Sequence, residues 1–339
     1  MKGERQVNRH SAVRYAMAVA AASLLLAGCG AGSPASTASG GSGRKTIGVS
    51  FDLLNAIRQA EKTAIQNAAN TAGYDVVFDV ADQDAQKQAA QIQDLIQTRK
   101  VSAVIAIAQD GQQIASSISL AKAHDVPFVA IDRAVADQQD ITFQVTGDPV
   151  ADGKLAAAEF TAAGKAKPLQ VLELVGALTD QNAIGRRDGF GAGVAGDADV
   201  SIVSQVPTDW KPDQALDGTS NALQRNAGIN AIFVPSDFLL SSVQSALTSA
   251  GRLAPIGDPQ HVFVVTIDGD PNGCKAMRAK TLDADVATQV GEFGKQAVAA
   301  ITTALGGKTV GQKAAQVKGL TLNQAGFATT SARVWGCAS

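Results

Sequence analysis

The chain has 339 residues, of which 45% are hydrophobic and 18% charged, with 29 lysines and arginines against 31 aspartates and glutamates. This length and composition are sufficient for two domains with large buried cores. The slightly acidic balance argues against a nucleic-acid-binding protein and against a basic membrane-binding face.

The N-terminus has the pattern of an export signal. A basic segment precedes an apolar run from Ala16 to Ala27, which is shorter than the roughly 20 residues that span a bilayer. The run closes on Leu26-Ala27-Gly28-Cys29, which resembles a bacterial lipobox. Residues 1–28 are therefore predicted to be a lipoprotein signal peptide, with Cys29 as the lipidated first residue of the mature protein. The alternative is an ordinary secretory signal in which Cys29 occurs by chance.

A flexible tether follows the signal peptide, because residues 29–44 are rich in glycine, serine and alanine. The mature protein is thus expected outside the cytoplasm, on the outer face of the cell membrane, with the lipid as its only membrane contact. In that oxidising compartment the two remaining cysteines, Cys274 and Cys337, are predicted to form a disulfide. The alternative is a pair of buried free thiols.

Short apolar runs alternate with longer amphipathic ones along the rest of the chain. In the first half, strands are expected at residues 46–51, 76–80, 103–108, 127–131 and 141–145, and helices at 55–72, 85–98 and 112–124. In the second half, strands are expected at 169–174, 200–206, 231–234, 261–267 and 284–287, and helices at 182–194, 212–225, 238–250 and 292–305. This alternation predicts parallel sheets flanked by helices. Two such cycles predict an α/β protein with two similar Rossmann-like lobes.

Polar side chains and one tryptophan follow the expected strands, at the sheet edge where α/β folds bind ligands. These residues are Asp52, Asn55, Arg58, Asp132, Arg133, Arg186, Trp210, Ser236, Asp268, Thr288 and Gln289. Carboxylates accept hydrogen bonds from hydroxyls, arginines donate through a planar fork, and an indole can cover the C–H face of a sugar ring. The pattern therefore predicts a site for a polyhydroxyl ligand.

Each of these residues also has a purely structural alternative. Asp132 and Arg133 could form a surface ion pair, and Arg186 could lie on a helix surface. Trp210 could pack within one lobe, while residues 52 and 55 could simply cap the first helix.

The order of the motifs resembles that of type I periplasmic solute-binding proteins of the ribose, xylose and galactose group. The matching segments are Ile47-Gly-Val-Ser50, Phe128-Val-Ala-Ile-Asp-Arg133, Arg186-Arg-Asp-Gly-Phe190, Ile232-Phe-Val-Pro-Ser-Asp237 and Val265-Thr-Ile-Asp-Gly269. The resemblance covers about residues 45–324 and implies two lobes that close over a ligand about a three-crossing hinge.

The departures from this group concern the ligand. The segment from Asp52 to Arg58 lacks the aromatic residues of ribose-like members, and Arg58 is similar to an arginine of xylose-binding members. Ser236 replaces the usual asparagine. The resemblance therefore implies a pentose, a pentitol or a related small polyol in preference to ribose or a pyranose hexose.

The resemblance also implies a domain division and a role. Residues 45–147 with 290–318 are expected to form the N-terminal lobe, and residues 148–289 with 319–339 the C-terminal lobe. The expected role is delivery of the ligand to an ABC transporter permease by a monomer that is not an enzyme and has no cofactor. The alternatives are a sensory subunit that presents the sugar to a membrane receptor or kinase, and an enzyme of carbohydrate metabolism. An enzyme would need a paired acid and base or a cofactor.

Two motif matches fail in their context. The G-x-G-x-x-G pattern at residues 191–196 ends an expected helix, whereas a dinucleotide site needs it to open one. The segment starting at Asp268 resembles a calcium loop but has Ala279 where a bidentate glutamate is required. No metal site is predicted.

Overall fold

The computed structural model describes residues 43–136 and 139–338. The predicted signal peptide, Cys29 and most of the tether lie outside the described residues. No helix among the described residues combines the length and apolar character needed to cross a membrane.

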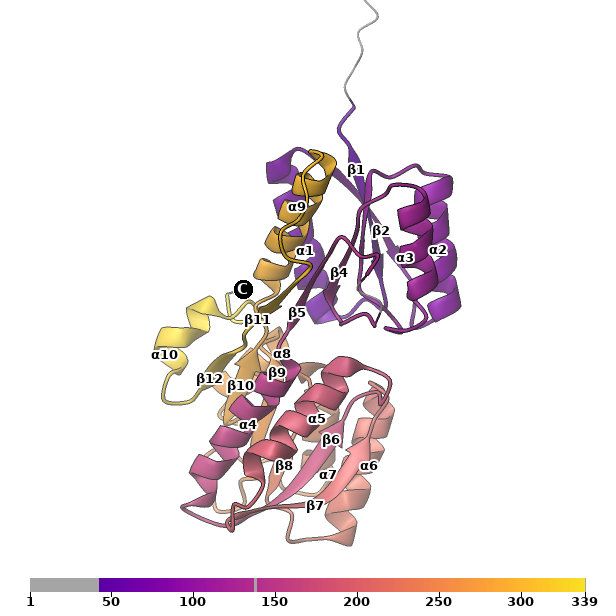
Figure 1. Cartoon of the computed structure of the whole chain (residues 1–339). Coiled ribbons are helices and arrows are strands. Elements are labelled where there is room, and N and C mark those ends of the chain that lie inside the picture. The colour runs from indigo at the N-terminus through magenta and orange to yellow at the C-terminus, as the bar shows by residue number, and fades with distance from the viewer. Residues whose placement is uncertain (1–42, 137–138, 339) are drawn as a thin grey trace, which may run out of the picture. The chain divides into compact units, whose positions relative to one another are not determined.

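The first lobe is built on a parallel sheet with the strand order β11-β5-β4-β3-β1-β2 (Figure 1). Its strands are β1 (Thr46–Phe51), β2 (Asp75–Val80), β3 (Ala103–Ala106), β4 (Phe128–Asp132), β5 (Phe143–Gly147) and β11 (Ala314–Val317). Its helices are α1 (Ala56–Ala72), α2 (Ala85–Gln97), α3 (Ala115–Ala123) and α9 (Val290–Leu305). Helices α1 and α9 pack on one face of the sheet, and α2 and α3 on the other. The central strands are buried on both faces, which explains their continuous apolar sequence.

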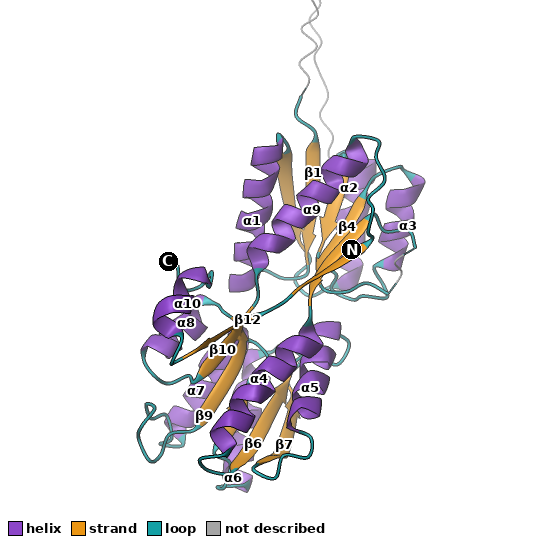
Figure 2. Ribbon diagram, turned by 60° about the vertical axis from the view of Figure 1, so that its left-hand side comes forward, coloured by secondary structure: helices purple, strands orange, loops and turns teal. Residues whose placement is uncertain are grey.

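The second lobe repeats this plan with the strand order β12-β10-β9-β8-β6-β7. Its strands are β6 (Leu169–Val175), β7 (Val200–Pro207), β8 (Ala231–Phe233), β9 (Phe263–Asp268), β10 (Ala284–Ala287) and β12 (Leu320–Asn323). Its helices are α4 (Pro149–Gly164), α5 (Gln181–Val194), α6 (Pro212–Arg225), α7 (Leu240–Ser249), α8 (Pro271–Arg278) and α10 (Phe327–Thr330). Helices α4 and α5 cover one face of the sheet, and α6 and α7 the other. Strand β12 alone runs antiparallel to its neighbour (Figure 2). Two α/β lobes with parallel sheets are therefore present, as the sequence predicts.

The chain passes between the two sheets three times: after β5, after β10 and after β11. The third passage is only Lys318 and Gly319 long. A Cβ atom on Gly319 would lie 2.4 Å from Oδ1 of Asp152, so a larger residue would clash with that buried carboxyl group. A glycine here allows three chain segments to lie close together.

Several elements differ from the sequence predictions. Helices α4 and α8 were not expected, and both begin with Asp-Pro: Asp148 accepts a hydrogen bond from Ala151 N, and Asp270 accepts from Gly273 N. An aspartate N-cap followed by proline is a strong start signal, but α4 consists largely of small residues that hide its periodicity. Helix α3 begins three residues later than expected because Asp110 accepts from the backbone of Gln112 in a preceding turn.

The strands β11 and β12 and the short helix α10 were not predicted either. Each is only four residues long, and segments of that length carry little periodicity. The expected helix at 238–250 begins instead with a 3-10 turn at residues 237–239, followed by α7.

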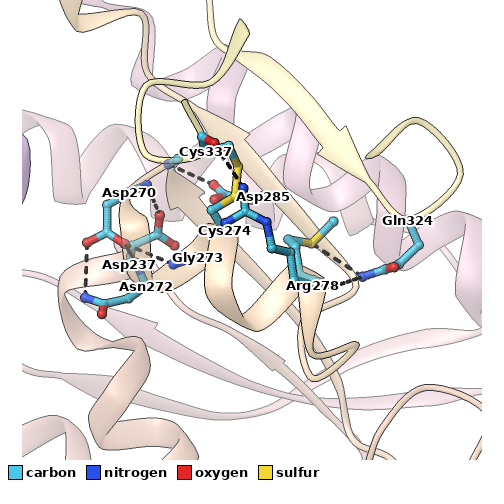
Figure 3. The surroundings of a disulfide bond; sticks show 11 residues. Asp237, Asp270, Asn272, Gly273, Cys274, Arg278, Asp285, Gln324 and Cys337 are labelled. Carbon is cyan, nitrogen blue, oxygen red and sulfur yellow. Dashed lines mark hydrogen bonds between the residues drawn. A yellow bond between two sulfur atoms is a disulfide. The ribbon is translucent and has the colours of Figure 1, made fainter. Parts of the chain in front are cut away.

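A disulfide joins α8 to the end of the chain. Cys274 and Cys337 are bonded, with their Cα atoms 5.3 Å apart (Figure 3). The two cysteines are 63 positions apart in the sequence, so the bond links two segments that meet only in the folded chain.

Candidate functional site

The carboxyl ends of strands from both lobes face one cavity. It is lined by side chains of both lobes, namely Leu53, Asn55, Ile57, Arg58, Asp132, Arg133, Asp180, Asn182, Arg186, Trp210, Ser236, Phe238 and Asp268. The cavity volume is about 40 Å³. A cavity of this size has room for only a few water molecules, each of which needs about 10–15 Å³. The charged side chains that line it therefore lie close enough to pair with one another.

The N-terminal half of the site is organised around Arg58, which is almost completely buried on the first turn of α1. Its guanidinium contacts three carboxylates: Nε lies 2.9 Å from Asp52 Oδ1, and Nη1 lies 2.9 Å from Glu61 Oε2 and 2.7 Å from Asp132 Oδ2. Asn55 caps α1 by accepting from the backbone N–H of Arg58 at 3.1 Å. Asn55 therefore lines the cavity and starts the helix that carries Arg58.

Arg133 extends from this half toward the other lobe. Its Nη1 lies 3.0 Å from Asp52 Oδ2, and its Nε lies 3.2 Å from Oδ2 of Asp180, which precedes α5. A second contact between the lobes joins Asn182 Nδ2 to Oδ1 of Asp132 at 3.2 Å. The two lobes thus meet through polar groups at the site.

The C-terminal half of the site is organised around Asp268. Its carboxylate accepts from Arg186 Nη2 at 2.8 Å and from the Ser236 hydroxyl, and Thr288 Oγ1 lies 3.5 Å away. The other terminal nitrogen of Arg186 donates to the backbone oxygen of Pro235 at 2.7 Å. Apart from Asp180, which pairs with Arg133, this half contains one arginine and one carboxylate, with neutral donors completing the arrangement.

Both central aspartates have unusual backbone angles. The φ of Asp132 is 61° and the φ of Asp268 is 125°, although residues with a Cβ rarely have positive φ. Each aspartate ends a buried strand, β4 or β9. Strained conformations of this kind concentrate at binding sites, where the surrounding structure enforces them.

Trp210 lies against the end of β6. Its indole Nε1 donates to Asp180 Oδ2 at 2.9 Å. A Cβ atom on Gly176 would come within 2.2 Å of the indole ring, so only glycine allows the ring this position. The indole is held both by its polar edge and by the backbone beneath it.

Burial and the arginines shift the acidities in opposite directions. Burial raises the pKa of Asp52, but Arg133 and Arg58 outweigh burial and leave the pKa below its ordinary value. Burial raises the pKa of Glu61 to about 8, because the opposing charge of Arg58 does not offset it. Burial likewise raises the pKa of Asp268 despite Arg186. The site therefore favours an ionised Asp52 and a protonated Glu61 near neutral pH.

The structure brings most of the predicted site residues together. Those that line the cavity are Asn55, Arg58, Asp132, Arg133, Arg186, Trp210, Ser236 and Asp268. Asp52 is fully buried behind the two arginines and does not line the cavity. Gln289 does not reach it either, because its amide donates to the backbone oxygen of Lys318 at the third passage between the sheets.

Sequence reasoning missed Asp180 and Asn182, together with the apolar Leu53, Ile57 and Phe238. A signal for Asp180 was present, since it follows β6 and caps α5 by accepting from Asn182 N at 2.9 Å. The apolar residues carried no signal. Among the described residues, no group of histidine, cysteine, aspartate and glutamate side chains could hold a metal ion.

Comparison with known proteins gives a family match. The family model named periplasmic binding protein domain matches residues 47–309 of the sequence. The ribose import binding protein RbsB of Bacillus subtilis is 30% identical over 290 residues, which cover 84% of this chain and 91% of that protein. The xylitol-binding protein of Mycolicibacterium smegmatis is 26% identical over 277 residues, covering 80% of this chain and 74% of that protein.

Solved structures share the fold. A solute-binding protein of an ABC transporter from Bacillus halodurans, with bound myo-inositol, has a TM-score of 0.77 at 22% identity, covering 87% of this chain and 99% of that one. The binding protein of the arabinose ABC transporter from Shewanella, bound to L-arabinofuranose, also has a TM-score of 0.77 at 22% identity. It covers 84% of this chain and 93% of that one.

Proposed function

Because the chain belongs to the periplasmic binding protein domain family, we propose that it captures a small sugar or polyol and delivers it to the permease of an ABC importer. Its family consists of binding proteins, so the chain is not an enzyme. The proposed location is outside the cytoplasm, with a lipid on Cys29 after removal of residues 1–28 and a tether at residues 29–44. The protein is proposed to act as a monomer.

One observation carries this proposal: three buried arginines and three carboxylates from both lobes face a single cavity beside an indole ring. Arg58, Arg133 and Arg186 offer several N–H donors, and Asp132 and Asp268 offer acceptors. A compact molecule with hydroxyls on all sides can satisfy such an arrangement, whereas an apolar ligand would leave the charged groups unpaired. Trp210 is placed to cover the C–H face of such a molecule.

The proposed ligand is a five-carbon sugar or its alditol. The segment between Asp52 and Arg58 supplies leucine and isoleucine but no aromatic ring, so the aromatic rings at the cavity are those of Trp210 and Phe238, both from the second lobe. Relatives named for ribose import and for xylitol binding support this size class. Ser236 offers a hydroxyl to Asp268 and leaves no amide at that position.

The proposed binding cycle begins with an opening of the two lobes, which admits the ligand, and ends with their closure around it. A cavity of about 40 Å³ holds no sugar ring, so a ligand enters only when the lobes part. Its hydroxyls then replace contacts such as Arg133–Asp180 between the lobes. Because the ligand contacts both lobes, it favours the closed arrangement. The lobe boundaries proposed for this motion are residues 45–147 with 290–318, and 148–289 with 319–339.

A thermal-shift screen of residues 45–339 against pentoses, hexoses and their alditols tests this proposal. A ligand that binds the folded state raises the melting temperature by mass action. We expect the largest shift with a five-carbon sugar or alditol, strongly reduced in Arg133→Ala and retained in Arg187→Ala, whose arginine pairs with Asp188 on the surface of α5. The five-carbon assignment is contradicted by a larger shift with hexoses. A flat response, in protein shown by mass spectrometry to carry no ligand, contradicts the sugar assignment.

A further inference from the structure

The C-terminal turn, residues 334–337, packs against the end of β9, where Asp268 enters the ligand site. We propose that this turn positions Asp268 for ligand binding, with Trp335 as the positioning residue and the Cys274–Cys337 disulfide as its anchor. The ligand part of this inference rests on the proposed function.

Hydrogen bonds join the turn directly to the strand end. The indole Nε1 of Trp335 donates to the backbone oxygen of Asp268 at 2.8 Å, and Gly336 N donates to Gly269 O at 3.0 Å. The oxygen of Asp268 also accepts from Thr288 N at 3.0 Å. Two donors from distant parts of the chain therefore fix the direction of the peptide group that follows Asp268.

The two segments also contact backbone to backbone. A Cβ atom on Gly336 would lie 2.1 Å from the carbonyl carbon of Asp270, and one on Gly269 would lie 2.8 Å from Val334 Cγ1. Gly269 has a φ of 76°, which also favours glycine. Such close approach leaves the strand end little freedom while the turn is in place.

Asp268 needs this support because its φ of 125° is one that residues with a Cβ rarely adopt. A strained residue keeps its conformation only when its surroundings enforce it. The side chain of Asp268 meets Arg186 and Ser236 in the cavity, so a rotation of its backbone would move the carboxylate relative to both. The turn thus acts on the ligand site through Asp268, without lining the cavity itself.

The disulfide keeps the turn in place. The elements that precede it, α10 and the 3-10 turn at 331–333, have no buried residue, so the turn itself, with Val334 in the core of the second lobe, provides the attachment. Cys274 lies in α8, whose N-cap Asp270 directly follows Gly269 (Figure 3). Arg278 of the same helix donates to Cys337 O at 3.0 Å. The covalent bond therefore ties the turn to the helix that begins three residues after Asp268.

The test uses Trp335→Phe, which removes the N–H donor and keeps most of the ring. Arg333→Ala, at an exposed position beside the turn, is the matched control. In the ligand-free protein, hydrogen exchange of peptides covering 263–273 and 284–289 should become faster in Trp335→Phe and stay unchanged in the control. Calorimetric titration with xylitol and with D-ribose should show a Kd raised about five- to tenfold, which is the loss of one hydrogen bond.

A second variant, Cys274→Ser with Cys337→Ser, tests the anchor, and phosphine-reduced wild type replaces it if that variant does not fold. Both should show the same faster exchange and the same weaker binding. Unchanged exchange at 263–273 in Trp335→Phe overturns the positioning of Asp268. Faster exchange with an unchanged Kd overturns the link between the C-terminal turn and ligand binding. If the wild type binds neither xylitol nor D-ribose, the titration uses the five-carbon sugar or alditol with the largest thermal shift, and if no such compound binds the ligand assignment fails. The exchange data then still decide whether the turn positions Asp268.

Discussion

The two halves of the site hold their charges in different ways. In the N-terminal half, Arg58 contacts three buried carboxyl groups and shares one of them, that of Asp52, with Arg133, so each ion depends on several other groups. In the C-terminal half, Arg186 has a single carboxylate partner, and hydroxyls and a backbone oxygen supply the remaining contacts. The first half is therefore held by a network of charges, whereas the geometry of the second half depends on the position of one strained residue, Asp268.

The largest expected effect is on folding, from Arg58→Met. The variant leaves Asp132 buried without its cation and Asp52 with Arg133 alone, and breaking such a buried pair costs about 3–5 kcal/mol. Arg186→Met removes the cation from Asp268, which still accepts from Ser236, and a weaker attraction to Asp152, and should lose less. Urea denaturation of both variants measures the difference. Equal losses would show that the two halves do not differ in this way.

The second-largest expected effect is on the affinity for the ligand, in the variant Arg133→Ala. Removing a charged donor to a ligand hydroxyl should weaken binding of xylitol or D-ribose by about 10- to 150-fold. The fold should persist, because Asp52 keeps Arg58 and Asp180 keeps the indole N–H of Trp210. Calorimetric titration measures the affinity, with Arg187→Ala as control. An unchanged affinity would remove Arg133 from the ligand contacts.

The pH dependence of the free energy of unfolding tests the N-terminal half of the site separately from the rest of the molecule. The pKa of Glu61 is raised from 4.5 to about 8 by burial, so the folded state binds its proton more tightly than the unfolded chain does. The stability contributed by Glu61 is therefore complete below pH 4.5 and is lost as the pH rises through 8. Glu61→Gln should remove a slope of up to about 1.4 kcal/mol per pH unit between these values.

Chemical denaturation at a series of pH values measures this slope. Glu292→Gln is the control, since that glutamate is partly exposed on α9 and pairs with Lys295. Asp152, Glu173 and Asp285, whose pKa values burial raises to about 7, titrate in every variant and cancel in the comparison. A variant with the slope of the wild type would show that Glu61 is ionised in the folded state.

The smallest expected effect is from Trp210→Phe, which keeps a ring against Gly176 but loses the donor to Asp180. The loss of one hydrogen bond is worth about 1 kcal/mol, or a fivefold weaker affinity for the pentitol or pentose. Trp210→Ala should lose more, because the ring face is also removed. If the two variants bind equally well, the ring does not contact the ligand.

The sequence predicted the parts of the site that follow directly from strand position. Asp132, Arg133 and Asp268 stand at the ends of buried strands, and parallel sheets bring such ends to one edge. Gln289 follows a strand by the same rule but does not line the cavity, because its amide donates to Lys318 in a passage flanked by two strands too short to predict. The pairing of Asp180 with Arg133 depends on how the lobes meet, which no local pattern encodes.

The discontinuous first lobe has a consequence for the order in which the chain folds. Helix α9 and strand β11 belong to this lobe but follow the whole of β6 to β10 in the sequence. Phe293 and Ala297 of α9 share one core with Ile65 and Ala69 of α1. The N-terminal portion of the chain therefore waits for residues 290–317 before that core can close, and a chain that stops before α9 should remain open to proteases.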